Sequence, residues 1–190
     1  MIAGPALRAM RTAERVFATT SDPPGLLQTA AEALALQPGH ACLISLVEPD
    51  GAAGVLRPVW LAHARPSAIG ELRAAVLGAG AGPSQASILA STARTTAGTD
   101  AFSRAVQRTG GTLRMQLDNP RLWRLWLPRA YWPYADEVHI KAVLASALCR
   151  HGQVVGTLLL WREGETAEPF TAADQAYVAA MAARLALGIV

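Results

Sequence analysis

The sequence has little charge and almost no lysine. Charged residues make up 16% of its 190 residues, and Lys141 is the only lysine among 17 basic residues. The arginines are scattered, apart from a group at Arg121, Arg124 and Arg129. A nucleic-acid surface shows a basic stripe or patch, which this pattern lacks. We therefore expect no DNA or RNA partner.

Cysteine and long apolar runs are also scarce. Only Cys42 and Cys149 are present, far apart in the sequence, which excludes a disulfide framework and fits a reducing compartment. The most apolar stretch, 176–190, carries Arg184 and is shorter than the ~20 residues that a membrane span needs. Charged residues within 8–15 interrupt the apolar core that a signal peptide needs. These absences predict a soluble, cytoplasmic protein without a membrane partner.

Motifs of known catalytic classes are missing as well. The sequence holds no G-x-S-x-G, H-E-x-x-H or P-loop pattern and no paired-carboxylate constellation. The glycine-rich stretch 78–83 lacks the G-K-[ST] that follows in a P-loop. We therefore expect a protein that is not an enzyme.

Hydrophobic periodicity divides the chain into alternating helices and strands. Apolar residues at helical spacing predict helices at 5–18, 26–36, 67–78, 100–110 and 170–189. Apolar, β-branched runs predict strands at 41–48, 55–64, 112–117, 138–149 and 153–163, with a long loop at 78–98. Pro58 implies that its strand lies at a sheet edge, because proline cannot donate to the ladder. Hairpins between strands predict an antiparallel sheet and an α+β fold.

Aromatic residues are only 6% of the chain, yet they gather in one segment. Residues 121–134, RLWRLWLPRAYWPY, hold three of the five Trp and two of the three Tyr. The aromatic side chains could wall a small-molecule pocket. Alternatively, Leu122, Trp123, Trp126 and Leu127 could seal one face of the sheet at helical spacing. An exposed patch for a protein partner is a third interpretation, and the sequence leaves all three open.

The C-terminal third resembles a GAF domain, a PAS-like sensory and regulatory module of bacterial signalling proteins. The likeness rests on G-x-V-x-G-x-L-x-L at 152–160 and F-T-x-x-D at 170–174, followed by an alanine-rich last helix. Asp118 and Pro120 match an Asp-x-Pro step of the family, whereas Ala147 stands where many members have proline. The resemblance covers about residues 22–189. It implies an N-terminal helix at 1–20 and a single GAF domain at 21–190.

The resemblance also implies an architecture and a function. The central antiparallel sheet should have the order 2-1-5-4-3, with the terminal helices on one face and a ligand pocket under the crossover region, 65–137, on the other. The protein should be a non-catalytic sensor that binds an unidentified small molecule, dimerises, or both, and regulates a linked or separate output module. The alternative is a dimerisation scaffold without a ligand. The pocket candidates are Met115, Trp123, Trp126, Tyr131, Trp132, Tyr134 and His139.

The family's cofactors suggest further candidates. In haem-binding members an axial histidine lies near the position of His139, so haem is an alternative cofactor; otherwise His139 lies at a strand edge. A covalent bilin, or the cysteine chemistry of members that reduce methionine sulfoxide, would need a cysteine within 65–137, and none is there. The pairs His40/Cys42 and Cys149/His151 have zinc-ligand residue types. The family's strand order places them at opposite ends of the sheet, so we expect no metal site.

The two terminal helices carry the expected dimer interface. The first helix has an apolar stripe with no place in a minimal domain core, and the last helix is apolar on more than one side, so each needs a second partner. By the family resemblance we expect a homodimer that these helices form. The interface candidates are Leu7, Met10, Phe17, Tyr177, Met181 and Leu185.

Overall fold

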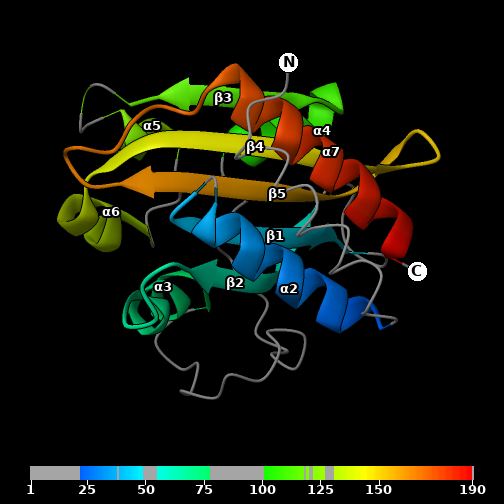
Figure 1. Cartoon of the computed structure of the whole chain (residues 1–190), viewed down its shortest axis with the longest axis horizontal. Helices are drawn as coiled ribbons and strands as arrows, with labels where there is room; N and C mark the ends of the chain where they lie inside the picture. Colours follow the sequence, from blue (N-terminus) through cyan, green and yellow to red (C-terminus); the bar gives the residue numbers. More distant parts are fainter. Residues whose placement is uncertain are drawn as a thin grey trace.

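The computed structural model describes residues 22–37, 39–48, 55–77, 101–117, 119, 122–126 and 131–189 (Figure 1). The expected first helix at 5–18 and the expected loop at 78–98 lie outside these residues. Among the helices of the described part, none is both long and apolar enough to cross a membrane.

A five-stranded antiparallel sheet forms the centre of the fold. Its strands are β1 (Ala41–Val47), β2 (Leu56–His63), β3 (Thr112–Gln116), β4 (Ile140–Arg150) and β5 (Gln153–Glu163), in the order β2-β1-β5-β4-β3. The predicted order is thus confirmed, and so is the edge position of Pro58 on β2. The β1–β2 ladder shifts register between Ile44 and Ser45, next to the partner position of Pro58.

Two helices cover one face of the sheet, α2 (Pro23–Leu36) and α7 (Ala172–Gly188), as Figure 1 shows. Local signals in the sequence fix both starts. The Asp22 carboxylate accepts the Gly25 N–H, with proline in the first turn. Thr171 and Asp174 form the predicted capping box.

The described part of the crossover region covers the other face with short helices. These are α3 (Ala68–Leu77), α4 (Ala101–Thr109), α5 (Trp123–Trp126) and α6 (Trp132–Val138). Within the described residues, the aromatic segment contributes α5 and the start of α6. In Figure 1, α6 lies at the end of the sheet where the β5 arrow ends.

The period-2 alternation of the strands divides the core into two layers. On β5, Leu158 and Leu160 pack under α2 and α7, whereas Leu159 and Trp161 face the crossover helices. By the same alternation, the side chains of His63 on β2 and Glu163 on β5 point toward the crossover helices. A Cβ at Gly156 would collide with the carbonyl oxygen of Ser45 on β1, so the β1–β5 pairing requires glycine there.

Candidate functional site

Polar side chains gather at one end of the sheet, where four strands begin or end. His40 precedes β1, His63 ends β2 and Glu163 ends β5, while α6 leads into β4 at the same end. In an antiparallel sheet of order 2-1-5-4, the start of β1 meets the ends of β2 and β5. The register confirms this, since Ala41 pairs with both His63 and Trp161.

Glu163 is the centre of a buried hydrogen-bond network. Its Oε1 accepts from Arg65 Nη2 at 2.6 Å and lies 2.9 Å from Nε2 of His63. Its Oε2 accepts the hydroxyl of Tyr134 at 2.5 Å. The side chains of His63 and Glu163 are 0% and 6% exposed, so a carboxylate here needs all these donors to offset its lost hydration. The network ties α6 to β2 and β5.

The network sets the ionisation of its members. Burial by itself would raise the pKa of Glu163, but the hydrogen bonds from His63, Tyr134 and Arg65 outweigh it and lower the pKa to about 2. Glu163 is therefore ionised in neutral solution. Burial, followed by the hydrogen bond to Glu163, raises the pKa of Tyr134, which keeps its hydroxyl proton. The indole N–H of Trp161 lies near this hydroxyl without reaching hydrogen-bond geometry with any described residue.

Backbone contacts determine which nitrogen of each histidine carries a proton. The backbone N–H of Arg65 donates to Nδ1 of His63 at 2.7 Å, so Nδ1 is an acceptor and Nε2 carries the proton that faces Glu163. In the same way, the backbone N–H of Glu163 donates to Nδ1 of His40 at 3.1 Å. The free Nε2–H of His40 is then a donor. Both imidazoles are held in one orientation by strand-end backbone.

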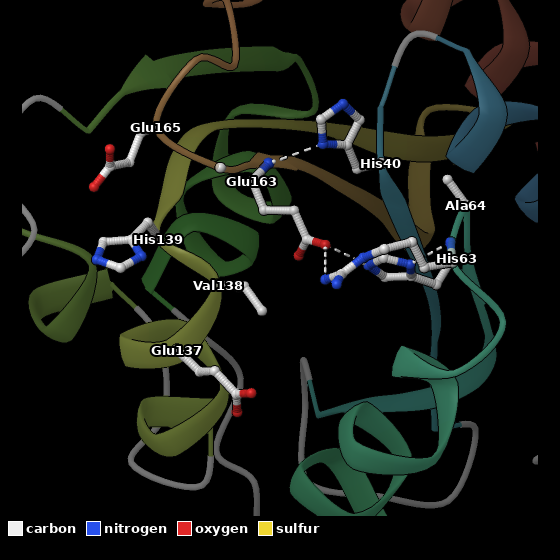
Figure 2. A pocket seen from close by; sticks show the side chains of 10 residues that line it. His40, His63, Ala64, Glu137, Val138, His139, Glu163 and Glu165 are labelled. Atoms are coloured by element: carbon white, nitrogen blue, oxygen red, sulfur yellow. Dashed lines mark hydrogen bonds and ion pairs between the residues drawn. The ribbon is translucent and has the colours of Figure 1, made fainter.

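A cavity of about 660 Å³ opens beside the network. Figure 2 shows its two sides: His40, His63 and Glu163 come from the strand ends, and Glu137, Val138 and His139 come from the end of α6. In this view the side chains of His139 and Glu165 turn away from Glu163. The described residues that line it are His40, His63, Ala64, Arg65, Glu137, Val138, His139, Glu163, Gly164 and Glu165. Its side chains are mostly ionisable, which suits a polar ligand.

The described lining does not fit haem. A porphyrin needs a broad apolar slot beside its axial ligand, but Ala64 and Val138 are the only apolar side chains around this cavity. A resident metal has no preformed site either, because no three His, Cys, Asp or Glu side chains of the described residues are arranged to hold an ion. The register places Cys42 and Cys149 at opposite ends of β5, as the strand order predicted.

The aromatic pocket candidates lie mainly in the core rather than around this cavity. Trp123, Tyr131 and Tyr134 are 1%, 7% and 4% exposed and pack against the sheet with α3 and α4. Trp132 is partly buried on the same cluster, and the side chain of Trp126 lies outside the described part. Leu122 is not a seal of the sheet, since it is 36% exposed.

Two further pocket candidates lie at cavities. His139 lines the large cavity as the residue that ends α6, in a left-handed conformation with φ of 54°. Met115 instead lines a second hollow of about 260 Å³ with Arg114, Gln116, Pro169 and Phe170. Of the expected pocket residues whose side chains the structure describes, only His139 lines the large cavity, while Tyr134 reaches its wall through Glu163.

The candidate dimer residues of α7 are covered by their own chain. Tyr177, Met181 and Leu185 are 7%, 2% and 0% exposed and pack against the sheet and α2. The outward face of α7 carries Leu187, which is 70% exposed, and several exposed alanines. Leu7, Met10 and Phe17 lie outside the described residues.

The sequence reasoning did not identify most of the strand-end site. His63, Arg65, Glu137, Glu163 and Glu165 were not candidates, and His40 was considered only as a metal ligand. A signal was available, because the predicted strand order already placed the start of the first strand beside the ends of the second and fifth. Polar residues at those strand ends could have been grouped by that rule.

Comparisons with known proteins agree with this architecture. The family model "GAF domain" matches residues 22–189, so the chain belongs to the GAF domain family. No curated protein sequence matches it significantly.

Solved structures show the same fold at low identity. One is the GAF domain of a phosphoenolpyruvate-protein phosphotransferase from Coxiella burnetii (TM-score 0.65, 15% identity, 97% of this chain and 92% of that one). Another is a GAF domain/HD domain protein from Geobacter sulfurreducens (TM-score 0.57, 15% identity, 88% of this chain and 92% of that one). A third is the free methionine-R-sulfoxide reductase of Neisseria meningitidis with its substrate (TM-score 0.59, 14% identity, 99% of this chain and 92% of that one).

Proposed function

We propose that this GAF domain is a cytoplasmic, non-catalytic sensor that binds a small polar molecule in the strand-end cavity and regulates a signalling output module. The cavity beside the Glu163 network is the observation that carries this proposal. Its volume of about 660 Å³ is within the range of roughly 300–1,000 Å³ usual for small-molecule sites. GAF domains linked to other domains, as in the Geobacter protein, support the regulatory part.

The lining favours a molecule with several hydrogen-bonding groups. Arg65, whose side chain is 59% exposed, offers guanidinium donors to the cavity, and the Nε2–H of His40 is a further donor. Glu137 of α6 and Glu165, which follows β5, offer exposed acceptors. A ligand that bears both acceptor and donor groups matches such a lining.

A thermal-shift screen of small polar metabolites tests this proposal. Ala64 lines the cavity and is exposed, so Ala64→Phe should fill part of the cavity without disturbing the core. Ala173→Phe adds the same ring to an exposed position on α7 and serves as the matched control. We expect a compound that raises the Tm of the wild type and of Ala173→Phe but not of Ala64→Phe. A compound that stabilises all three proteins equally would bind elsewhere and contradict the proposal.

The buried aromatics favour a second candidate, a dimerisation scaffold without a ligand. Trp123, Leu72 and Phe102 fill the space between the sheet and the crossover helices, where a family ligand would be expected. Since Tyr177, Met181 and Leu185 are buried, such a dimer would use the outward face of α7 around Leu187. Light scattering decides this point: Leu187→Asp should convert a dimer into a monomer, and a wild-type monomer would exclude the scaffold.

A further inference from the structure

Polar contacts hold helix α6 to the end of the sheet, beside the apolar packing of Tyr134 and Ala135. Tyr134, near its middle, donates its hydroxyl to Glu163 Oε2 at 2.5 Å. At its end, the backbone N–H of Gly164 donates to the carbonyls of Val138 and His139, at 2.9 and 3.1 Å. Because Glu163 ends β5 and Gly164 follows it directly, the position of α6 depends on this strand end.

The start of α6 is tied to α5 by an aromatic cluster. The rings of Trp123 and Trp132 meet edge to face, with centroids 6.1 Å apart. The Arg124 guanidinium lies over both rings, at 5.1 and 5.4 Å from their centroids, and pairs with Asp136 of α6 at 2.9 Å. A shift of α6 would therefore be transmitted to α5 and to the indole rings.

The junction between α6 and β4 is a single residue in a left-handed conformation. His139 has φ of 54° and ψ of 73°, a left-handed conformation that a side chain other than glycine adopts only at a cost. It is exposed and immediately precedes β4, whose pairing with β5 is extensive. A change at this one residue would reorient α6 and leave the sheet in place.

The cavity contacts both sides of the Tyr134–Glu163 hydrogen bond. Its lining includes Glu163 with two of its donors, His63 and Arg65, and also the end of α6. Arg65 is the donor that a ligand can reach, since its side chain is 59% exposed whereas that of His63 is 0% exposed. An anionic group in the cavity would compete with Glu163 for Arg65 and leave the buried carboxylate less compensated.

We propose that the hydrogen bond from Tyr134 to Glu163 is a latch that holds α6 and the aromatic cluster against the sheet, and that an anion-bearing ligand releases it by taking Arg65. This inference rests on the proposed function, because it names the anionic group of the ligand and how the same cavity regulates the domain. Arg65 positions Glu163 in the ligand-free protein and binds the anionic group when the ligand is present. The movement of α6 is the signal that the sensor produces.

Hydrogen exchange in the ligand-free protein tests the latch. Arg65→Met imitates the loss of Arg65 to a ligand, and Tyr134→Phe removes only the latching oxygen. A hydrogen bond to a charged group is strong enough that its loss should speed exchange of the α6 amides about tenfold or more. Exchange in β4 and β5 should change far less. Tyr177→Phe removes a hydroxyl from the other core layer and should leave α6 unchanged.

The double variant Arg65→Met/Tyr134→Phe shows whether Arg65 acts through the hydrogen bond from Tyr134 to Glu163. Without the Tyr134 hydroxyl, α6 no longer shields Glu163 from water, so adding Arg65→Met should accelerate α6 exchange little beyond Tyr134→Phe alone. If the double variant instead shows an increase in α6 exchange equal to the product of the two single increases, Arg65 and Tyr134 act independently and the coupling between them is overturned. Exchange that rises equally throughout the sheet would show a general stabilising role and also overturn the latch.

An anion titration separates this inference from the proposed function. Inorganic phosphate at rising concentration is the probe, at constant ionic strength set with chloride. The latch predicts faster α6 exchange in the wild type and no phosphate effect in Arg65→Met. Phosphate could bind the wild type but not Ala64→Phe, which would place it in the cavity. If such binding left the exchange of the α6 amides unchanged, it would contradict the latch and leave the sensor proposal standing. A metabolite screen that finds no ligand for the cavity would contradict the sensor proposal alone.

Discussion

Replacing Glu163 by glutamine should weaken the fold in a way that depends on pH. The network lowers the pKa of this carboxyl from 4.5 to about 2. Each pKa unit corresponds to about 1.4 kcal/mol, so the ionised carboxylate contributes at most about 3.5 kcal/mol to the free energy of unfolding. The side chain of Arg65 is 59% exposed, so solvent screens its interaction with Glu163. We therefore expect the ionised carboxylate to contribute about 2 kcal/mol to the free energy of unfolding.

The sign of the pH dependence follows from the lowered pKa. A carboxyl with a lower pKa in the folded state stabilises the protein above its unfolded-state pKa, and this stabilisation is lost as the pH falls from about 4.5 to about 2. Urea unfolding, followed by tryptophan fluorescence, should show the wild type more stable than Glu163→Gln by about 2 kcal/mol at pH 7. More than half of this difference should be gone at pH 3.

The neighbouring Glu165 provides the control. Its side chain lines the same cavity but is exposed, and Glu165→Gln should leave unfolding nearly unchanged at both pH values. A difference between wild type and Glu163→Gln that is the same at pH 7 and pH 3 would refute the reasoning. So would a Glu163→Gln protein that is more stable than the wild type at neutral pH.

Three further predictions concern packing and reactivity. Gly156→Ala should lower the free energy of unfolding by about 1–3 kcal/mol through overpacking on β1, whereas Gly70→Ala, in α3 with open space around it, should raise it by up to about 1 kcal/mol; urea unfolding measures both. Trp123→Ala should cost about 3–5 kcal/mol in the same assay, because the indole is 1% exposed; a small loss would mean that the indole is not part of the core. A thiol reagent should modify Cys149 in the native protein and Cys42 only after unfolding, since burial raises the pKa of Cys42. Mass spectrometry of labelled peptides checks this order.

The sequence contained enough local information to predict the five strands and the helices α2, α3, α4 and α7, but not α5 and α6. Helix starts depend on residues three apart, and Thr171 with Asp174 showed one such start directly. The alternation of β4 and β5 and the turn at His151 and Gly152, both with positive φ, specify a tight hairpin. The family resemblance then supplied the strand order that these local signals lack.

The site was harder to predict because it depends on register between distant strands. Tyr134 is 71 residues from His63 and 29 residues from Glu163, and no spacing rule joins them. A one-residue slip of β5 would turn Glu163 to the opposite face of the sheet. The concentration of aromatics pointed to the correct segment, but the same residues can form a core or a pocket wall. Only the burial of Trp123 and Tyr134 distinguishes these interpretations.

Native mass spectrometry tests the central claim most directly. The wild type and Ala64→Phe would be incubated with the small-molecule fraction of a cell extract, desalted and weighed under native and denaturing conditions. The account predicts an added mass on the wild type that denaturation removes and that Ala64→Phe fails to retain. A wild type that retains no added mass, or an added mass that Ala64→Phe retains equally, would contradict a ligand site in the strand-end cavity.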